Sequence, residues 1–409
     1  MSFRLTLILL NVVALFVIAG VIVWRVVSLR RNQETTPANQ TPFLDDEGLE
    51  GRRLERALGW SLVFVLIIAV ALPVYFLLEP TRQVQMEEGF VERSVEQGAV
   101  LYAGQASPEY NAEVSLLCAN CHGVEGEGGA APFVIQPESD KCVEEENQGN
   151  EDVPECLPKQ VSWEAPPVNT ALLRFDREQV TEILNYGRPG TPMPAWGVIS
   201  GQGVLNEQSI DDLVNYLESI QISSKEATAI SKEAVNEYRV SGSDLVDQVE
   251  EELATATEAL TAAQADRTTT PAALAELQDA VDSAQAELEA ATAYAEEVED
   301  LSEGAVLFRL NCARCHTKGW SYFDPTNLEL PPLPPQGSGA YGPNLRDGST
   351  LLQFPGKAGK DEQFSWIALG VPANNQYGVR GISSGRMPHF ARQLTDDQIT
   401  KIVEYERNL

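Results

Sequence analysis

The sequence predicts an all-α protein with an N-terminal two-helix transmembrane hairpin, two copies of one small helical domain, and an antiparallel helical hairpin between the copies. Three observations predict this organisation. Two apolar stretches stand near the N-terminus, a long-period repeat covers most of the remaining chain, and an Ala- and Glu-rich segment with helical periodicity separates the two halves of the repeat. At 409 residues the chain is too long for a single hydrophobic core.

These features divide the chain into four parts. The expected parts are residues 1–80 for the transmembrane hairpin with a loop at 25–57, 81–222 for the first copy, 223–300 for the helical segment, and 301–409 for the second copy.

The two apolar stretches, residues 5–24 and 58–78, are each long enough to cross a membrane. In a helix about 20 residues, at about 1.5 Å each, span a hydrocarbon core of roughly 30 Å. A cleaved signal peptide is the alternative for the first stretch. However, this stretch is longer than the apolar region of a signal peptide, and arginines follow it. We therefore expect two transmembrane helices.

The loop between the two stretches is rich in arginine, which predicts its side of the membrane. Positively charged loops remain in the cytoplasm, so the chain after residue 78 is expected to be extracytoplasmic. The six arginines are Arg25, Arg30, Arg31, Arg52, Arg53 and Arg56.

The formal net charge of −31 argues against a nucleic-acid-binding protein, because phosphate recognition depends on clustered Lys and Arg. A basic or membrane-embedded partner fits this charge better.

The repeat aligns short segments at matched distances. Residues 98–102 align with 304–308, and residues 205–216 align with 394–405 without a gap. In each copy a C-x-x-C-H motif follows the first segment. Two copies of one domain explain this pattern.

The C-x-x-C-H motif is the attachment sequence for c-type haem. Its two thiols add to the haem vinyl groups, and the adjacent histidine becomes an axial ligand of the iron. A zinc site and a thioredoxin-like thiol pair are the alternatives, but neither explains a histidine after each second cysteine. The predicted attachment residues are Cys118, Cys121 and His122 in the first copy and Cys312, Cys315 and His316 in the second.

Two methionines are candidates for the second axial ligand. Met193 and Met387 each lie 71 positions after the motif histidine of their copy, and each precedes a proline. A buried core methionine is the alternative at either position. Histidine and methionine ligation would raise the reduction potential of the iron.

Each copy resembles the class I cytochrome c domain, over residues 97–220 and 303–409. The resemblance implies an all-α fold in which the first and last helices cross, and two covalently attached haem c groups. It also implies that a proline carbonyl orients the motif histidine, which matches Pro343 in the second copy and Pro166 or Pro167 in the first. The helix pairs expected to cross are 94–102 with 210–217, and 303–310 with 397–405.

Cys142 and Cys156 remain once the motif cysteines are assigned. They lie in one acidic insertion, residues 136–158, outside the membrane, where cysteines oxidise. We predict a disulfide, which would close a loop of about 15 residues and stabilise the domain by roughly 3 kcal/mol in the chain-entropy model.

The segment between the copies contains two apolar stripes at spacings of three and four, which indicate two helices. Thr270 and Pro271 predict the start of the second helix, as N-cap and first helical residue. A disordered acidic linker is the alternative. The stripes are Leu245, Val249, Leu253, Ala256, Leu260 and Ala263, then Leu274, Leu277, Val281, Ala284, Leu288 and Ala291.

The two-domain arrangement resembles the dihaem cytochrome c subunit of bacterial cytochrome bcc complexes, and the N-terminal membrane hairpin resembles the dihaem subunit of cbb-type oxidases. The first resemblance implies respiratory electron transfer from a complex with cytochrome b and Rieske subunits towards a terminal oxidase, in the bacterial cell membrane. The second implies electron input to a haem-copper oxidase. In either role the chain is an electron-carrying subunit and not a catalyst alone. A dihaem peroxidase is a distant alternative. A peroxidase needs an open position on one iron, whereas here a methionine is available to each haem.

Overall fold

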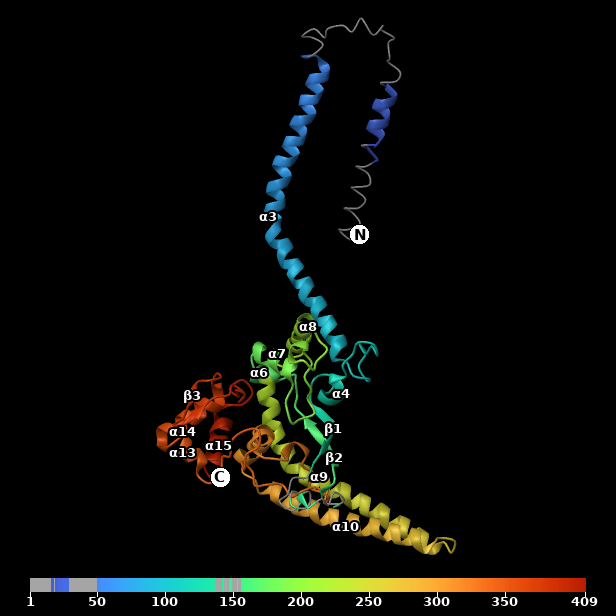
Figure 1. The fold of residues 1–409 in the computed structure, drawn as a ribbon, viewed down its shortest axis with the longest axis vertical. Coiled ribbons are helices and arrows are strands. Elements are labelled where there is room, and N and C mark those ends of the chain that lie inside the picture. The colour runs from blue at the N-terminus through green and yellow to red at the C-terminus, as the bar shows by residue number, and fades with distance from the viewer. Residues whose placement is uncertain are drawn as a thin grey trace. The chain divides into compact units, whose positions relative to one another are not determined.

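Helices form most of the described chain, as predicted, and two antiparallel two-stranded sheets accompany them there. The computed structural model describes residues 16–17, 19–28, 50–136, 142, 144, 147–148, 153 and 156–409. The chain divides into two compact units, Met1–Gln85 and Met86–Leu409 (Figure 1).

The first unit contains most of one long apolar helix. This helix is α3, Arg52–Tyr102, and its most apolar window has a mean hydropathy of 2.8 with no residue buried. Among the described residues it is the one helix long and apolar enough to cross a membrane, which suggests a membrane anchor. The second predicted span, residues 58–78, lies within α3. The first, residues 5–24, falls mostly outside the described residues.

The second unit contains both copies of the repeated domain. The first copy begins with the last turns of α3 and continues through α4 (Cys118–His122), β1 (Gly129–Ile135), β2 (Lys159–Ala165), α6 (Ala171–Arg174), α7 (Arg177–Tyr186), η2 (Val198–Ser200) and α8 (Glu207–Ser219). The second copy consists of α11 (Glu303–Asn311), α12 (Ala313–His316), η3 (Trp320–Tyr322), α13 (Ser349–Gln353), α14 (Gly356–Leu369), β3 (Gln376–Tyr377), β4 (Gly381–Ile382) and α15 (Asp396–Glu406).

The first and last helices of each copy cross where a glycine lets their backbones approach. A Cβ atom on Gly98 of α3 would lie 2.0 Å from the carbonyl oxygen of Asp212 in α8. The equivalent atom on Gly304 of α11 would lie 2.3 Å from the carbonyl oxygen of Lys401 in α15. Both crossings are the helix pairs expected from the sequence, and any side chain at either glycine would push the helices apart.

One aromatic pair packs beside each crossing. The rings of Tyr102 and Tyr216 have centroids 5.2 Å apart, and those of Phe308 and Tyr405 are 5.3 Å apart. Tilted aromatic contacts of this kind add about 0.5–1.5 kcal/mol beyond the area they bury. The repeat in the sequence is therefore also a repeat in core packing.

A two-stranded ribbon, which was not expected from the sequence, flanks the acidic insertion of the first copy. β1 and β2 pair antiparallel, with Phe133 opposite Val161. Alternate residues of β2 are buried, among them Val161 and Trp163. This period of two is the signal that could have identified the strand, because alternate side chains of a strand point to opposite faces.

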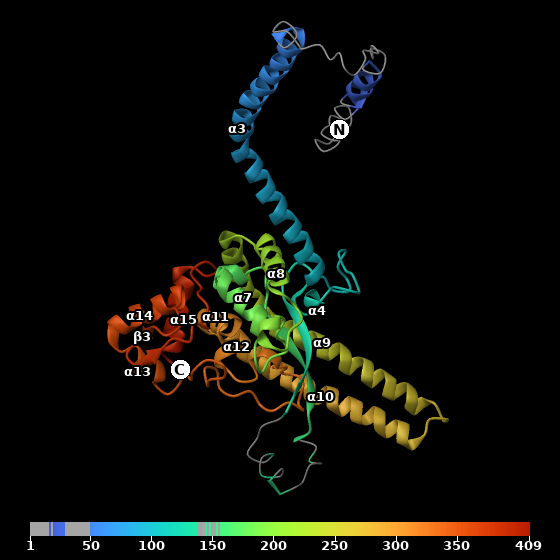
Figure 2. The ribbon, with the colours of Figure 1, turned by 45° about the horizontal axis from the view of Figure 1, so that its top comes forward.

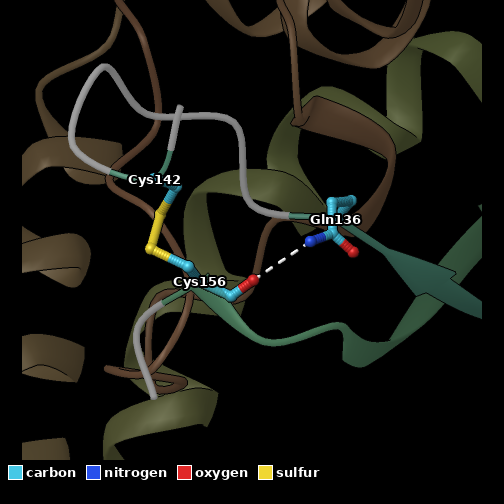
Figure 3. The surroundings of a disulfide bond; sticks show 3 residues. All are labelled: Gln136, Cys142 and Cys156. Atoms are coloured by element: carbon cyan, nitrogen blue, oxygen red, sulfur yellow. Dashed lines mark hydrogen bonds between the residues drawn. A yellow bond between two sulfur atoms is a disulfide. The ribbon is translucent and has the colours of Figure 1, made fainter. Parts of the chain in front are cut away.

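A disulfide between Cys142 and Cys156 closes the loop that the ribbon carries, with the two Cα atoms 5.3 Å apart (Figure 3). The side-chain amide of Gln136, just after β1, donates a hydrogen bond to the carbonyl oxygen of Cys156 at 3.1 Å. The predicted disulfide is therefore confirmed.

Two long helices connect the copies. α9, Ser224–Ala265, and α10, Pro271–Glu299, lie side by side in both views (Figures 1 and 2). The hydroxyl of Thr270 accepts a hydrogen bond from the backbone N–H of Ala273 at 3.3 Å, and Pro271 is the first helical residue. The predicted hairpin and its turn are confirmed.

The N-terminal half of α9 packs into the core of the second copy. Val235 of α9 is buried in the same cluster as Val306 and Ile399. The side-chain amide of Gln398 donates a hydrogen bond to the hydroxyl of Ser231 at 3.3 Å. These contacts favour the hairpin over a disordered linker, because burial of apolar side chains offsets the entropy lost on ordering.

Glu406, at the end of α15, makes stability depend on pH. Burial raises the pKa of Glu406 to about 7, and a hydrogen bond donated by Gln363 at 2.9 Å opposes the rise. An unfolded glutamate has a pKa of about 4.3, so between these values the folded chain binds more protons than the unfolded chain. Stability is therefore expected to fall as pH rises from about 4 to 7, by on the order of 3 kcal/mol from this group.

Urea unfolding of the intact protein between pH 4 and pH 8 measures this dependence, and Glu406→Gln should flatten the curve. Glu404→Gln is the matched control, because Glu404 lies on the same helix with 57% of its side chain exposed. Equal slopes for Glu406→Gln and the unsubstituted chain would contradict the assignment.

Candidate functional site

The first motif forms one short helix. Cys118, Cys121 and His122 lie on α4, directly after Leu117, whose left-handed backbone (φ 64°) turns the chain into the helix. The Nδ1–H of His122 donates a hydrogen bond to the carbonyl oxygen of Pro166 at 2.9 Å. Because a carbonyl can only accept, Nδ1 holds the proton and Nε2 keeps a lone pair for a metal.

The second motif repeats this geometry. Cys312 directly precedes α12, and the Nδ1–H of His316 donates to the carbonyl oxygen of Pro343 at 2.9 Å. A Cβ atom on Gly342 would lie 2.5 Å from Cε1 of His316, so glycine is required beside the ring. Pro343 is the acceptor expected from the sequence. In the first copy the structure selects Pro166 over Pro167.

Burial sets the protonation of the motif side chains. It lowers the pKa of His122 and of His316, while the hydrogen bonds to the proline carbonyls oppose the change. Both imidazoles are therefore neutral at pH 7, as a metal ligand must be. Burial also raises the pKa of Cys118 to about 12. A redox-active cysteine has a lowered pKa, so this environment disfavours the thioredoxin-like alternative.

Met193 and Met387 occupy equivalent positions before the last helix of each copy. Met193 packs against the core cluster that contains Ala119 of the first motif. Met387 packs against the cluster that contains Cys312 and Ala313. Each methionine therefore packs against the same core as its motif, as ligation of one iron by the histidine and the methionine would require.

In the described part of the first copy, two buried donors have no hydrogen-bond acceptor, namely Nε1 of Trp196 and Nε of Arg174. An unpaired buried donor costs about 1–3 kcal/mol, so these atoms mark the place of an acceptor from outside the chain. Haem has two propionate carboxylates that can accept from such donors. The residues of this domain therefore fit a haem.

The two copies contact each other close to the predicted ligands. The hydroxyl of Tyr341, two residues before Pro343, donates to the carbonyl oxygen of Gly190 at 2.7 Å. The side-chain amide of Gln179 donates to the carbonyl oxygen of Gly385, two residues before Met387, at 3.1 Å. Neither contact was predicted, because the repeat describes each copy and not how the copies meet.

Two family models match the chain. One is described as cytochrome c and matches residues 96–221, and the other as cytochrome c oxidase, cbb3-type, subunit III, and matches residues 299–405. No curated protein and no solved structure matches. Each model covers one copy with its C-x-x-C-H motif, and cytochrome c domains imply covalently bound haem c. The chain is therefore an electron-transferring c-type cytochrome with two cytochrome c domains and a helix that is long and apolar enough to anchor it in a membrane.

Proposed function

We propose that this cytochrome carries electrons through two covalently bound haems, from a quinol-oxidising cytochrome bc complex towards a terminal oxidase of the respiratory chain. The observation that carries the proposal is the presence of two attachment motifs at equivalent places of two domains in one chain. Two redox centres in adjacent domains, on a chain with an apolar anchor helix, suit a relay between membrane complexes.

The predicted site residues have defined roles in this proposal. The thiols form thioether links, and a neutral histidine and a methionine ligate each iron. When bound, haem c supplies a one-electron ferric/ferrous couple, and the methionine thioether raises its potential. The first domain, 81–222, contributes Cys118, Cys121, His122 and Met193, and the second, 301–409, contributes Cys312, Cys315, His316 and Met387.

The proposal places both domains outside the cytoplasm of a bacterial cell, behind a hairpin formed by residues 1–80. A reporter fused after Asn32 should therefore behave as cytoplasmic and one fused after Leu409 as extracytoplasmic, because the loop arginines remain inside. Alkaline phosphatase and fluorescent-protein fusions measure the two sides. A cytoplasmic C-terminus would contradict the orientation.

A second candidate is the electron-input subunit of a cbb-type oxidase, which the match of residues 299–405 to a cbb3-type oxidase subunit III model favours. Purifying the tagged protein in mild detergent from its native membranes and identifying its companions tests both candidates. Cytochrome b and Rieske subunits support the first candidate, and a cbb-type catalytic subunit supports the second. Stable isolation of the chain alone, with no respiratory subunit, would count against both.

A further inference from the structure

One arginine inside the second attachment motif binds the first domain. Arg314 lies between Cys312 and Cys315, and its Nη1 donates to the backbone carbonyl oxygen of Glu164 at 2.6 Å. Its Nη2 donates to Oε1 of the same glutamate at 3.0 Å. The guanidinium thus holds both the backbone and the side chain of one residue, a two-point geometry that arginine provides and lysine does not.

The residue that Arg314 binds belongs to the segment that orients the first histidine. Glu164 is the penultimate residue of β2, and two positions later the carbonyl of Pro166 accepts the hydrogen bond from His122. A short path of bonds therefore connects the two motifs. It runs from the second motif through Arg314 and Glu164 to the acceptor of the first imidazole.

Two further contacts hold β2 against the second domain. The ring of Trp163, which is 8% exposed, lies 5.4 Å from the ring of Tyr322. The amino group of Lys159 donates to the carbonyl oxygen of Glu329 at 2.7 Å. The ribbon of the first domain thus packs against the second domain, and ion pairs there join Arg314 to Glu164 and Lys159 to Glu329.

The charge of Arg314 lies between the two motifs. Arg314 is itself part of the second motif, and its guanidinium is hydrogen-bonded to Glu164, two residues before the acceptor of His122. Only 24% of the Arg314 side chain is exposed, so solvent screens this charge less than it screens a surface arginine.

We infer that Arg314 is a positioning residue that couples the two haem sites: its contacts with Glu164 hold β2 and the Pro166 acceptor in place, and its charge favours the reduced state in both domains. This inference rests on the proposed function in one respect, that each domain holds a haem.

The test uses Arg314→Gln in the full-length, haem-loaded protein, with two measurements. In a spectroelectrochemical titration, loss of the positive charge should lower the potential of the first domain as well as that of the second. We expect about a threefold change in the reduction equilibrium of the first domain, or about 30 mV at about 59 mV per tenfold. Hydrogen–deuterium exchange of residues 159–165 should also become several-fold faster.

Two variants separate charge from geometry. Arg314→Lys keeps the charge but loses the two-point contact, so it should restore the potential of the first domain and leave the exchange of β2 fast. Arg380→Gln removes the same charge from an exposed residue between β3 and β4, and should change neither the first potential nor the exchange.

If Arg314→Gln moves only the second wave and leaves the exchange of β2 unchanged, the inference is wrong. An equal shift of the first wave in Arg380→Gln would also overturn it, since the effect would then be unspecific. Failure of the proposed function in that respect would look different, because the unsubstituted protein would then retain fewer than two haems per chain.

Discussion

Chains unfolded in denaturant should retain two haems each, and Cys121→Ala and Cys315→Ala should each remove about one. Thioether links are covalent and survive the loss of the fold, whereas a haem held only by its iron ligands leaves an unfolded chain. The haem-to-protein ratio by pyridine haemochrome absorbance, together with the mass of the denatured chain, measures the result. Of all the expected effects this is the largest, because one cofactor is lost from one domain.

Cysteines outside the motifs provide the matched control. The double variant Cys142→Ala and Cys156→Ala removes the disulfide and should keep both haems, because this pair lies in the insertion between β1 and β2. Release of haem into acidified acetone from the unsubstituted protein would contradict covalent attachment. A single retained haem would contradict the proposed number and would leave one domain as a c-type centre.

Met193→His and Met387→His should each lower the potential of one domain by on the order of 100–200 mV. A thioether favours ferrous iron, and an imidazole, as a stronger donor to ferric iron, reverses that preference. At about 59 mV per tenfold, this is a change of roughly two to three powers of ten in the reduction equilibrium. A redox titration of each variant should show one wave displaced and the other unchanged.

Met86→His is the control for the methionine series, because Met86 lies in α3 ahead of residues 96–221, the part of the first domain that matches the cytochrome c model. It should move neither wave. If Met387→His also moves neither, Met387 serves only core packing and the iron has another ligand. His389 is then the first candidate, since it is two residues away and half-buried.

The sequence alone determined the features whose chemistry is local. The spacing of the motif brings Cys118, Cys121 and His122 close enough to attach one haem. Thr270 and Pro271 marked a helix start because a stripe of apolar residues at helical spacing follows them. The repeat aligned residues 98–102 with 304–308, so the helix crossing that the resemblance to class I cytochrome c domains implies was expected in both copies. These features were predicted because each depends on neighbours in the chain or on a copy of itself.

The tertiary structure decided how the two domains meet and which groups act across that boundary. It selected Pro166 as the acceptor for His122, paired β1 with β2 across the acidic insertion, and brought Arg314 to Glu164 over 150 positions of sequence. Contacts between the domains cannot be derived from the repeat. They depend on the shape and charge of two surfaces that differ between the copies. The ribbon has no counterpart in the second copy, so only its packing against Tyr322 and Arg314 reveals its role.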